Sequence, residues 1–338
     1  MQSRPLVLLA ALAVLFAGGA TAAVSVLAAG KEAVSTTTVG AELKDPDLAA
    51  RFAPVLMLMN GELFHPIDRP TYVAYTDLVE VIERRGGHRD YRLIDPSPTL
   101  QTLGTVKDCV NNCHWALKVA GLDMHYGLGG YAALERRLMK DHKPTVYWHI
   151  VQGSTGTIVQ YWFFYLFDNW KNWHESDLEQ ISIRLDASGK TPCEAGYSQH
   201  ATGEVRTWGD VEKSADGHAI VYVAVGSHAN YFEPKKRQVK VRVFGAHFFS
   251  GFDHPEHPDP AQQLAPADYQ LVRLGPPIFR DGDYGSGNFG TNGRERPRLF
   301  GNRVTVADPR TRGAIWSNPS EWLAKFRPSQ PTSPEPGC

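Results

Sequence analysis

Thr157-Ile-Val-Gln-Tyr-Trp-Phe-Phe-Tyr-Leu-Phe167 is the stretch of the chain that decides the fold. It carries no charge and is mostly aromatic or β-branched, which indicates a strand buried on both faces. Shorter stretches of β-branched and aromatic residues, bounded by Gly, Pro, Asp and Asn, predict further strands. They are residues 145–151, 180–185, 219–225, 239–244 and 269–274.

Helices have a smaller part in the predicted fold. Apolar residues at helical spacing predict one helix over residues 72–85, which Gly86-Gly87 would end, and a second over residues 131–140. The 31 Gly and 23 Pro suit strands joined by turns better than a helix bundle. We therefore expect a mainly β protein, an antiparallel β-sandwich with helical decorations and long loops.

The N-terminus carries a signal for export. Arg4 precedes an uncharged apolar run, and Ala20-Thr-Ala22 offers a cleavage site, so residues 1–22 are interpreted as a signal peptide of a secreted or extracytoplasmic protein. The alternative is an N-terminal membrane anchor, because no charge follows until Lys31. Residues 23–44 are interpreted as a linker, 45–327 as a single domain and 328–338 as a disordered Pro/Ser tail.

The charges nearly cancel, with 35 basic and 36 acidic residues. No basic field attracts nucleic acid, so we expect no nucleic-acid partner. The basic stretch Lys235-Lys-Arg237 with Lys240 and Arg242 is interpreted as a solvated strand face or as a contact to an anionic lipid or glycan surface. The sequence does not predict an oligomeric state.

The four cysteines allow two interpretations. In an exported chain Cys109 and Cys113 could close a local disulfide, and Cys193 could pair with Cys338. The alternative is a zinc site made of Cys109, Cys113 and His114, which lacks a second ligand pair at standard spacing.

Acidic residues and a histidine follow the central strand. If residues 177–185 form a strand, Asp177 and Glu179 lie on its apolar face. Burying unpaired carboxylates is costly, and a cation bound between them removes that cost. Asp168 ends the preceding strand and His174 lies in the connecting loop, so a hairpin would bring all four side chains to one end of the sheet.

Three carboxylates and an imidazole suit a divalent ion such as Mg²⁺, Ca²⁺ or Mn²⁺, with Zn²⁺ less favoured. His200 and His228, at the ends of predicted strands, could be additional ligands or hydrogen-bonded core histidines. The alternative is that no ion binds. In that case His174 caps a turn, and Asp177 and Glu179 pair with nearby cations, namely Arg184, Lys171 or Arg206.

Four motifs follow one another along the chain. They are Gln160-Tyr-Trp-Phe-Phe-Tyr165, His174-Glu-Ser-Asp177-Leu-Glu179, Tyr197-Ser-Gln-His200 and Val221-Tyr-Val-Ala-Val-Gly226-Ser-His228-Ala-Asn-Tyr231. In combination they resemble the vacuolar protein sorting-associated protein 62 family, and the resemblance covers most of residues 48–323. The central motif of that family is His-Glu-Gly-Asp-Trp-Glu, from which Ser176 and Leu178 depart.

That central motif is similar to the Gly-His-Arg-His-Asp-Trp-Glu motif of the necrosis- and ethylene-inducing cytolysins. Those are secreted β-sandwich proteins in which Asp, His, Asp and Glu bind a divalent ion. The resemblance implies ligand roles for Asp168, His174, Asp177 and Glu179. It implies no toxicity, because the rest of the cytolysin pattern is not present.

Three functions are consistent with these observations. The first is a secreted binding or membrane- or glycan-acting module whose ion contacts an anionic or sugar-bearing ligand. The second is a metal-dependent hydrolase in which Glu175 or His200 is the general base. The third is an envelope protein whose metal is purely structural.

Overall fold

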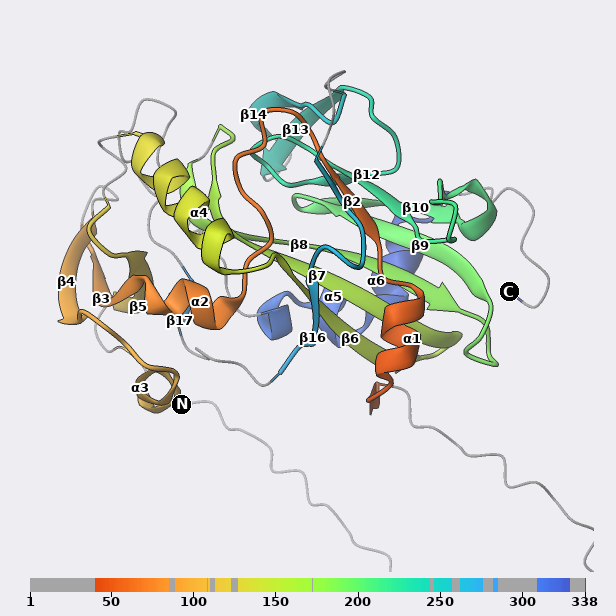
Figure 1. Ribbon diagram of the computed structural model, residues 1–338, viewed down its shortest axis with the longest axis horizontal. Coiled ribbons are helices and arrows are strands. Elements are labelled where there is room, and N and C mark those ends of the chain that lie inside the picture. Colours follow the sequence, from red (N-terminus) through yellow and green to blue (C-terminus); the bar gives the residue numbers. More distant parts are fainter. Residues whose placement is uncertain are drawn as a thin grey trace, which may run out of the picture. The chain divides into compact units, whose positions relative to one another are not determined.

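Two long antiparallel strands, β7 (Gly156–Asp168) and β8 (His174–Leu185), form the central hairpin of the largest sheet (Figure 1). Both are buried along their whole length, because neither face of the hairpin is left open to solvent. The register pairs Asp168 with His174 and Tyr165 with Asp177. The strands predicted over 157–167 and 180–185 are confirmed, and each is longer than predicted.

The largest sheet has the order β1-β6-β7-β8-β9-β10, and β16 also pairs with β6. All its neighbours are antiparallel except β16 and β6, which run parallel. The remaining strands are β1 (Glu42–Leu43), β6 (Thr145–Gly153), β9 (Pro192–Gln199), β10 (Thr202–Thr207) and β16 (Gln270–Arg273).

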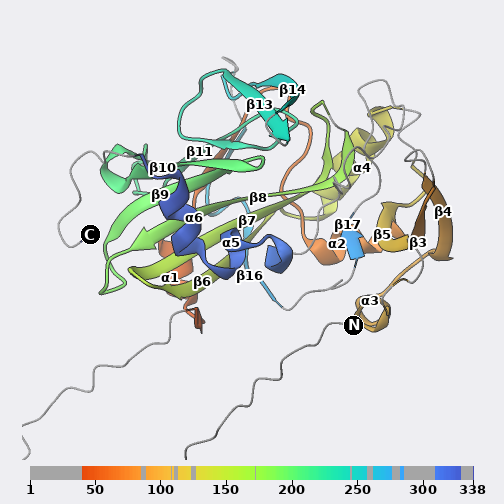
Figure 2. The same ribbon diagram turned by 180° about the vertical axis from the view of Figure 1, so that it is seen from behind.

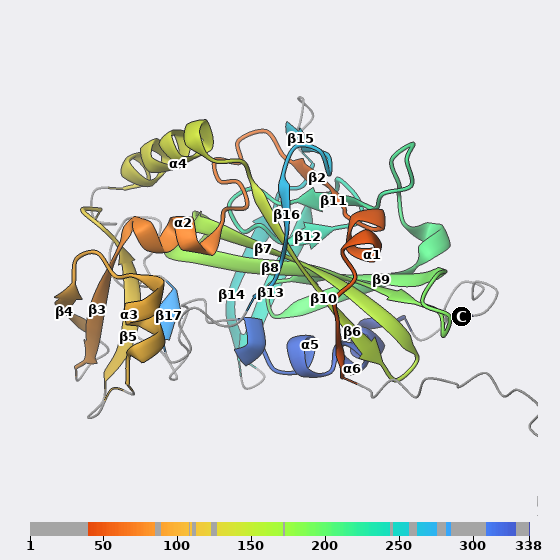
Figure 3. The ribbon, with the colours of Figure 1, turned by 60° about the horizontal axis from the view of Figure 1, so that its bottom comes forward.

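A second sheet, with the order β12-β11-β2-β15, lies against one face of the largest sheet (Figure 3). Leu56 and Val221 of this sheet share one hydrophobic core with Phe163 and Ile181 of the hairpin. The two layers form a β-sandwich-like arrangement, so the predicted mainly β class is confirmed. The strands are β2 (Val55–Leu58), β11 (Ile220–Val223), β12 (Asn230–Tyr231) and β15 (Gln262–Leu264).

Two smaller sheets complete the described strands. One has the order β17-β5-β3-β4, and its elements are β3 (Thr76–Glu83), β4 (Arg89–Asp95), β5 (Cys113–Val119) and β17 (Gly282–Tyr284). The other is the hairpin of β13 (Arg237–Val243) and β14 (Ala246–Asp253). The strands predicted over 145–151, 219–225, 239–244 and 269–274 correspond to β6, β11, β13 and β16.

The helices are short, and only one of the two predicted helices forms as expected. The prediction over 131–140 is confirmed by α4 (Gly129–Asp141). The prediction over 72–85 is wrong, because α2 (Arg69–Ala74) ends early and β3 follows it. Val79, Val81 and Ile82 are β-branched, and β3 pairs with both β4 and β5, which outweighs the helical spacing.

The other helices frame the sheets. Segments α5 and α6 lie on the face of the largest sheet opposite the second sheet, as Figures 2 and 3 show. In the described part of the chain, single turns of 3₁₀ helix occur at Trp208–Asp210 and Pro309–Thr311. The remaining helices are α1 (Pro46–Arg51), α3 (Leu100–Thr105), α5 (Ala314–Ser317) and α6 (Pro319–Phe326).

The computed structural model describes residues 40–338 apart from 85–88, 108, 110–112, 123–126, 172, 244–245, 257–261, 276–281, 285–308 and 329–337. The described residues all fall within one unit, Thr37–Cys338. The interpretations of residues 1–22 as a signal peptide, of 23–39 as linker and of 329–337 as tail lie outside the described residues. In the part of the chain that is described, no helix is long and apolar enough to cross a membrane.

Two disulfides join the four cysteines, Cys109 with Cys113 and Cys193 with Cys338. The alternative zinc site of Cys109, Cys113 and His114 is therefore wrong, because sulfurs bonded to each other are not thiolate ligands. Stable disulfides are typical of proteins outside the reducing cytoplasm. The bonds indicate an extracytoplasmic protein.

Candidate metal centre

Asp168, His174 and Asp177 converge at one end of the β7–β8 hairpin. Each offers one ligand atom, and these three atoms all lie within 4.8 Å of one another. All three residues are buried, with exposed fractions of 4%, 5% and 8%. Asp168 and His174 meet because they are register partners at the closed end of the hairpin, where His174 Nε2 lies 3.5 Å from Asp168 Oδ2.

Asp177 joins the cluster where the backbone departs from regular strand geometry. Strict alternation would place His174 and Asp177 on opposite faces of β8, since they are three residues apart. Ser176, between them, has a φ of 59°, in the left-handed region that few non-glycine residues adopt. This turn of the backbone interrupts the alternation. The Ser176 hydroxyl donates a hydrogen bond to the Tyr284 carbonyl, which holds the unusual conformation.

The hydrogen bonds of His174 leave one ring nitrogen free for a ligand. Nδ1 lies 2.7 Å from the Ser176 carbonyl oxygen, which can only accept, so Nδ1 carries the proton. In the neutral ring Nε2 then has a lone pair, and Nε2 is the atom on the Asp168 side. Metal-binding histidines are commonly oriented by such a bond from the other ring nitrogen to a backbone carbonyl.

The two aspartates differ in their surroundings. Asp168 accepts a hydrogen bond from the Trp170 backbone N–H at 2.8 Å, and burial raises its pKa to about 6. Burial alone would also raise the pKa of Asp177, but the hydrogen bond and charge of His228 outweigh burial and lower it. Two carboxylates this close and this buried need positive charge nearby.

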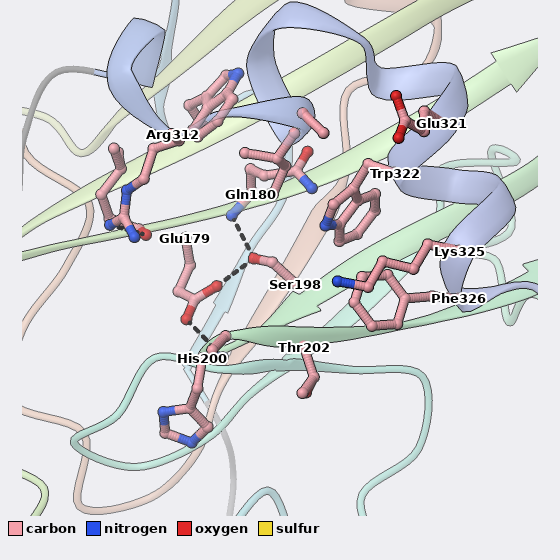
Figure 4. A pocket seen from close by; sticks show the side chains of 15 residues that line it. Glu179, Gln180, Ser198, His200, Thr202, Arg312, Glu321, Trp322, Lys325 and Phe326 are labelled. Atoms are coloured by element: carbon pink, nitrogen blue, oxygen red, sulfur yellow. Dashed lines mark hydrogen bonds between the residues drawn. The ribbon is translucent and has the colours of Figure 1, made fainter. Parts of the chain in front are cut away.

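Glu179, the fourth predicted ligand, lies beside the three-residue cluster and is not among its members. Its carboxylate accepts hydrogen bonds from the Ser198 hydroxyl and from the His200 backbone N–H (Figure 4). Burial, with a smaller contribution from the charge of Asp177, raises the pKa of Glu179 to about 8. A protonated Glu179 is therefore the favoured form at neutral pH.

His228 reaches the centre from the segment that follows β11. Its ring lies between two carboxylates, with Nδ1 2.8 Å from Asp177 Oδ2 and Nε2 3.5 Å from Glu62 Oε1. Although burial opposes protonation, these two carboxylates raise the pKa of His228 to about 10. His228 is thus a buried cation that partly balances the acids.

His200 lies on the other side of Glu179. Its Nε2 is 2.9 Å from Asp253 Oδ2, and Asp253 also accepts hydrogen bonds from Ser227 and Tyr231. Burial would lower the pKa of His200, but Asp253 raises it to about 9. Both His200 and His228 have positive φ, 57° and 51°, so all three such non-glycine residues among those described lie at this centre.

Glu175, the other candidate general base, faces away from the cluster. Its carboxylate accepts hydrogen bonds from the Tyr131 hydroxyl at 2.8 Å and from the Val119 backbone N–H at 3.2 Å, and it is fully buried. These contacts join β8 to α4 and β5. Glu175 therefore helps to hold β8, α4 and β5 together.

Two of the three cations that might have neutralised the acids have other partners. Arg184 pairs with Glu194 at 2.7 Å, and Arg206 pairs with Glu204 and Glu233. The interpretation in which these arginines pair with Asp177 or Glu179 is therefore wrong. Asp177 instead lies against His228, whose Nδ1 is 2.8 Å from Asp177 Oδ2.

Sequence reasoning gave no role at this centre to two carboxylates that complete it. Glu62 contacts His228 and accepts the Gly226 backbone N–H at 2.6 Å, and Asp253 contacts His200. Each lies far along the chain from the histidine that it contacts. No spacing within the sequence could have indicated them.

Comparisons with known proteins identified no relative of this chain. No protein-family model matches the chain, and no curated protein or solved structure matches it.

Proposed function

We propose that this protein binds one divalent metal ion between Asp168, His174 and Asp177. The observation that carries the proposal is the convergence of their three ligand atoms within 4.8 Å at a buried hairpin end. The orientation of His174 by the Ser176 carbonyl supports it, because that bond leaves Nε2 as the ligand atom. Carboxylate and imidazole ligands suit Mn²⁺, Ca²⁺ or Mg²⁺, and Zn²⁺ is a further candidate.

The resemblance to the vacuolar protein sorting-associated protein 62 family and to the cytolysin motif fits this proposal. Position 176 is glycine in that family motif, and here Ser176 has the positive φ that glycine adopts most readily. The ligand positions 174 and 177 match both motifs. Glu179 could bind the ion only if its hydrogen bonds to Ser198 and His200 were broken. We therefore propose it as a fourth ligand that joins the three-residue cluster when the ion binds.

We further propose that the protein is secreted and acts as a binding module for an anionic lipid or glycan surface. Its two disulfides support export. The hydrolase alternative receives less support, because Glu175 is held by Tyr131 and Val119, and His200 by Asp253.

Calorimetry and electron paramagnetic resonance with Mn²⁺ test the metal site. We expect one ion per chain, and at least a tenfold loss of affinity in Asp168→Asn and in His174→Gln. Asp168 is the better choice than Asp177, whose removal would also take from His228 the nearer of its two carboxylate partners. Asp216→Asn, in an exposed turn, is the matched control and should bind as the wild type does. Equal binding by Asp168→Asn and wild type would contradict the proposal.

Sedimentation with vesicles tests the module. We expect binding to vesicles that contain phosphatidylserine in the presence of Mn²⁺, and weaker binding after Asp168→Asn. If vesicle binding is the same with and without Mn²⁺ and in Asp168→Asn, the ion has only a structural role.

A further inference from the structure

A cavity of about 350 Å³ lies between the largest sheet and the α5–α6 segment (Figure 4). Glycines in the sheet let α6 come this close. A Cβ on Gly203 would lie 2.6 Å from Trp322 Cζ2, and one on Gly196 would clash with Leu323 Cδ2. The guanidinium of Arg327 pairs with Glu194 of β9 and fastens the end of α6 to the sheet. The cavity is therefore bounded by packed elements on two sides.

The floor of the cavity contains two buried N–H donors that have no acceptor among the described residues. They are the Trp162 indole Nε1 and the Gln180 amide Nε2, and the two side chains are 1% and 0% exposed. The Gln180 carbonyl oxygen, by contrast, accepts a hydrogen bond from Ser182 at 2.8 Å. Buried N–H groups are nearly always paired, so both donors call for an acceptor.

The rim of the cavity carries two cations. Arg312 and Lys325 line it, are exposed, and form no ion pair with a carboxylate of the described residues, and Arg312 donates one hydrogen bond to the Leu178 carbonyl at 3.1 Å. The lining also holds two acids: Glu179 is buried and bonded to Ser198 and His200, and Glu321 is exposed and accepts a bond from Asn318 through one of its two oxygens. Donors and positive charge thus outnumber the acceptors that are free to contact a ligand.

The wall of the cavity is aromatic. The rings of Trp322 and Phe326 lie with centroids 5.3 Å apart, and Leu178, Ala314 and Ile315 add apolar surface. Such a wall suits a flat apolar body, and small-molecule sites commonly combine apolar walls with a few polar groups.

We infer that this cavity binds a small organic anion, a carboxylate or phosphate ester attached to a flat apolar body. Acceptor oxygens would meet the floor donors Trp162 and Gln180, and the rim cations would hold the negative charge. The apolar body would lie against Trp322 and Phe326. The inference names a ligand class for the proposed binding function and does not require the metal ion, although Glu179 borders both sites.

Ligand-observed NMR and calorimetry on the full chain in EDTA test this inference, with benzoate and phenyl phosphate as probes. Benzyl alcohol lacks the charge, and inorganic phosphate lacks the apolar body. We expect the two aryl anions to bind at least tenfold more tightly than either comparator. Absence of aryl-anion binding, or equally tight binding of either comparator, would overturn the inference.

Substitutions locate the site. Arg312→Gln with Lys325→Gln should weaken benzoate binding at least tenfold, and Gln180→Leu should weaken it further. Lys140→Gln, an exposed lysine on α4, is the control and should have no effect. Thermal melts show whether each variant is folded. If Gln180→Leu does not fold, the variant with Arg312→Gln and Lys325→Gln is sufficient to test the site. Unchanged affinity in the rim variants would overturn the inference.

The same measurements separate this site from the metal centre. Benzoate binding that persists in Asp168→Asn, together with absent Mn²⁺ binding in the wild type, would remove the metal proposal alone. Mn²⁺ binding without aryl-anion binding would remove the cavity inference alone.

Discussion

The imidazole of His228 lies flat on the phenol ring of Tyr165, with ring centroids 3.8 Å apart and an interplanar angle of 9°. This stacking holds a buried cation between Asp177 and Glu62, two carboxylates from different parts of the chain. The positive charge of His228 therefore offsets part of the negative charge of Asp177 and Glu62, as a bound metal ion would.

Removal of the His228 charge should destabilise the protein. In His228→Gln the carboxylates of Asp177 and Glu62 lose their cation, and we expect a loss of about 3–5 kcal/mol in the free energy of unfolding. Mn²⁺ should restore part of that loss if it binds Asp177. Urea denaturation with and without Mn²⁺ measures both effects. Tyr165→Phe is the control, because its hydroxyl has no partner among the described residues.

The affinity for Mn²⁺ should fall at acid pH. The folded-state pKa of Asp168 is about 6, so below that pH a proton competes with the ion for the carboxylate. For each proton that the ion displaces, we expect the affinity for Mn²⁺ to decrease by up to about tenfold per pH unit below 6. Calorimetry at pH 5, 6 and 7.5 measures this decrease. A flat affinity down to pH 5 would contradict a ligand role for Asp168.

The ion pair of His200 and Asp253 predicts stability that declines in alkali. The folded-state pKa of His200 is raised from 6.5 to about 9, so its contribution is complete below pH 6.5 and is lost as pH rises through 9. That difference corresponds to roughly 3 kcal/mol. His200→Gln should therefore flatten the dependence of the unfolding free energy on pH between 6.5 and 9. A dependence identical to that of the wild type would contradict this assignment.

Gly203 should tolerate no side chain while Trp322 is present. A Cβ there would lie 2.6 Å from Trp322 Cζ2, so Gly203→Ala should lose about 1–3 kcal/mol of stability through overpacking. Trp322→Leu in the same chain should recover part of that loss, which a double-mutant cycle measures. Gly104→Ala is the matched control, because nothing lies within 4 Å of its Cβ position and α3 favours alanine.

The two disulfides should contribute unequally. Cys193 and Cys338 are 145 residues apart, and Cys109 and Cys113 only 4. Closing the longer loop restricts the unfolded chain more, by about 5 kcal/mol against about 2 in the chain-entropy model. Replacing Cys193 and Cys338 by serine should therefore lower the melting temperature more than replacing Cys109 and Cys113. The reverse order would show that unfolded-chain entropy does not dominate.

Local sequence patterns predicted the strands well and the site in part. Buried strands such as β7 are rich in aromatic and β-branched residues without charge, which favours a strand covered on both faces over a helix, so their positions could be predicted from the residues. The segment 72–85 shows the limit of that reasoning. Its apolar spacing fits a helix, but pairing of β3 with two other strands gives its backbone a better set of hydrogen bonds.

The same limit applies to the metal centre. The convergence of Asp168 and His174 follows from a hairpin, which the sequence predicted. The position of Glu179 outside the cluster could not be predicted in this way. Strand alternation gives no information about Ser198, a residue of β9 whose hydroxyl donates a hydrogen bond to the Glu179 carboxylate. The left-handed backbone at Ser176 also carries no local signal, since serine rarely adopts it.

The sequence by itself determined that two long apolar strands form a hairpin and that acids and a histidine gather at its end. Periodicity acts over a few residues, and that range suffices for strands and for neighbours across a turn. Only the tertiary structure decided which charges face the acids. His228 reaches Asp177, and Glu62 reaches His228, from segments distant in the chain, and contacts over such separations depend on how the layers pack.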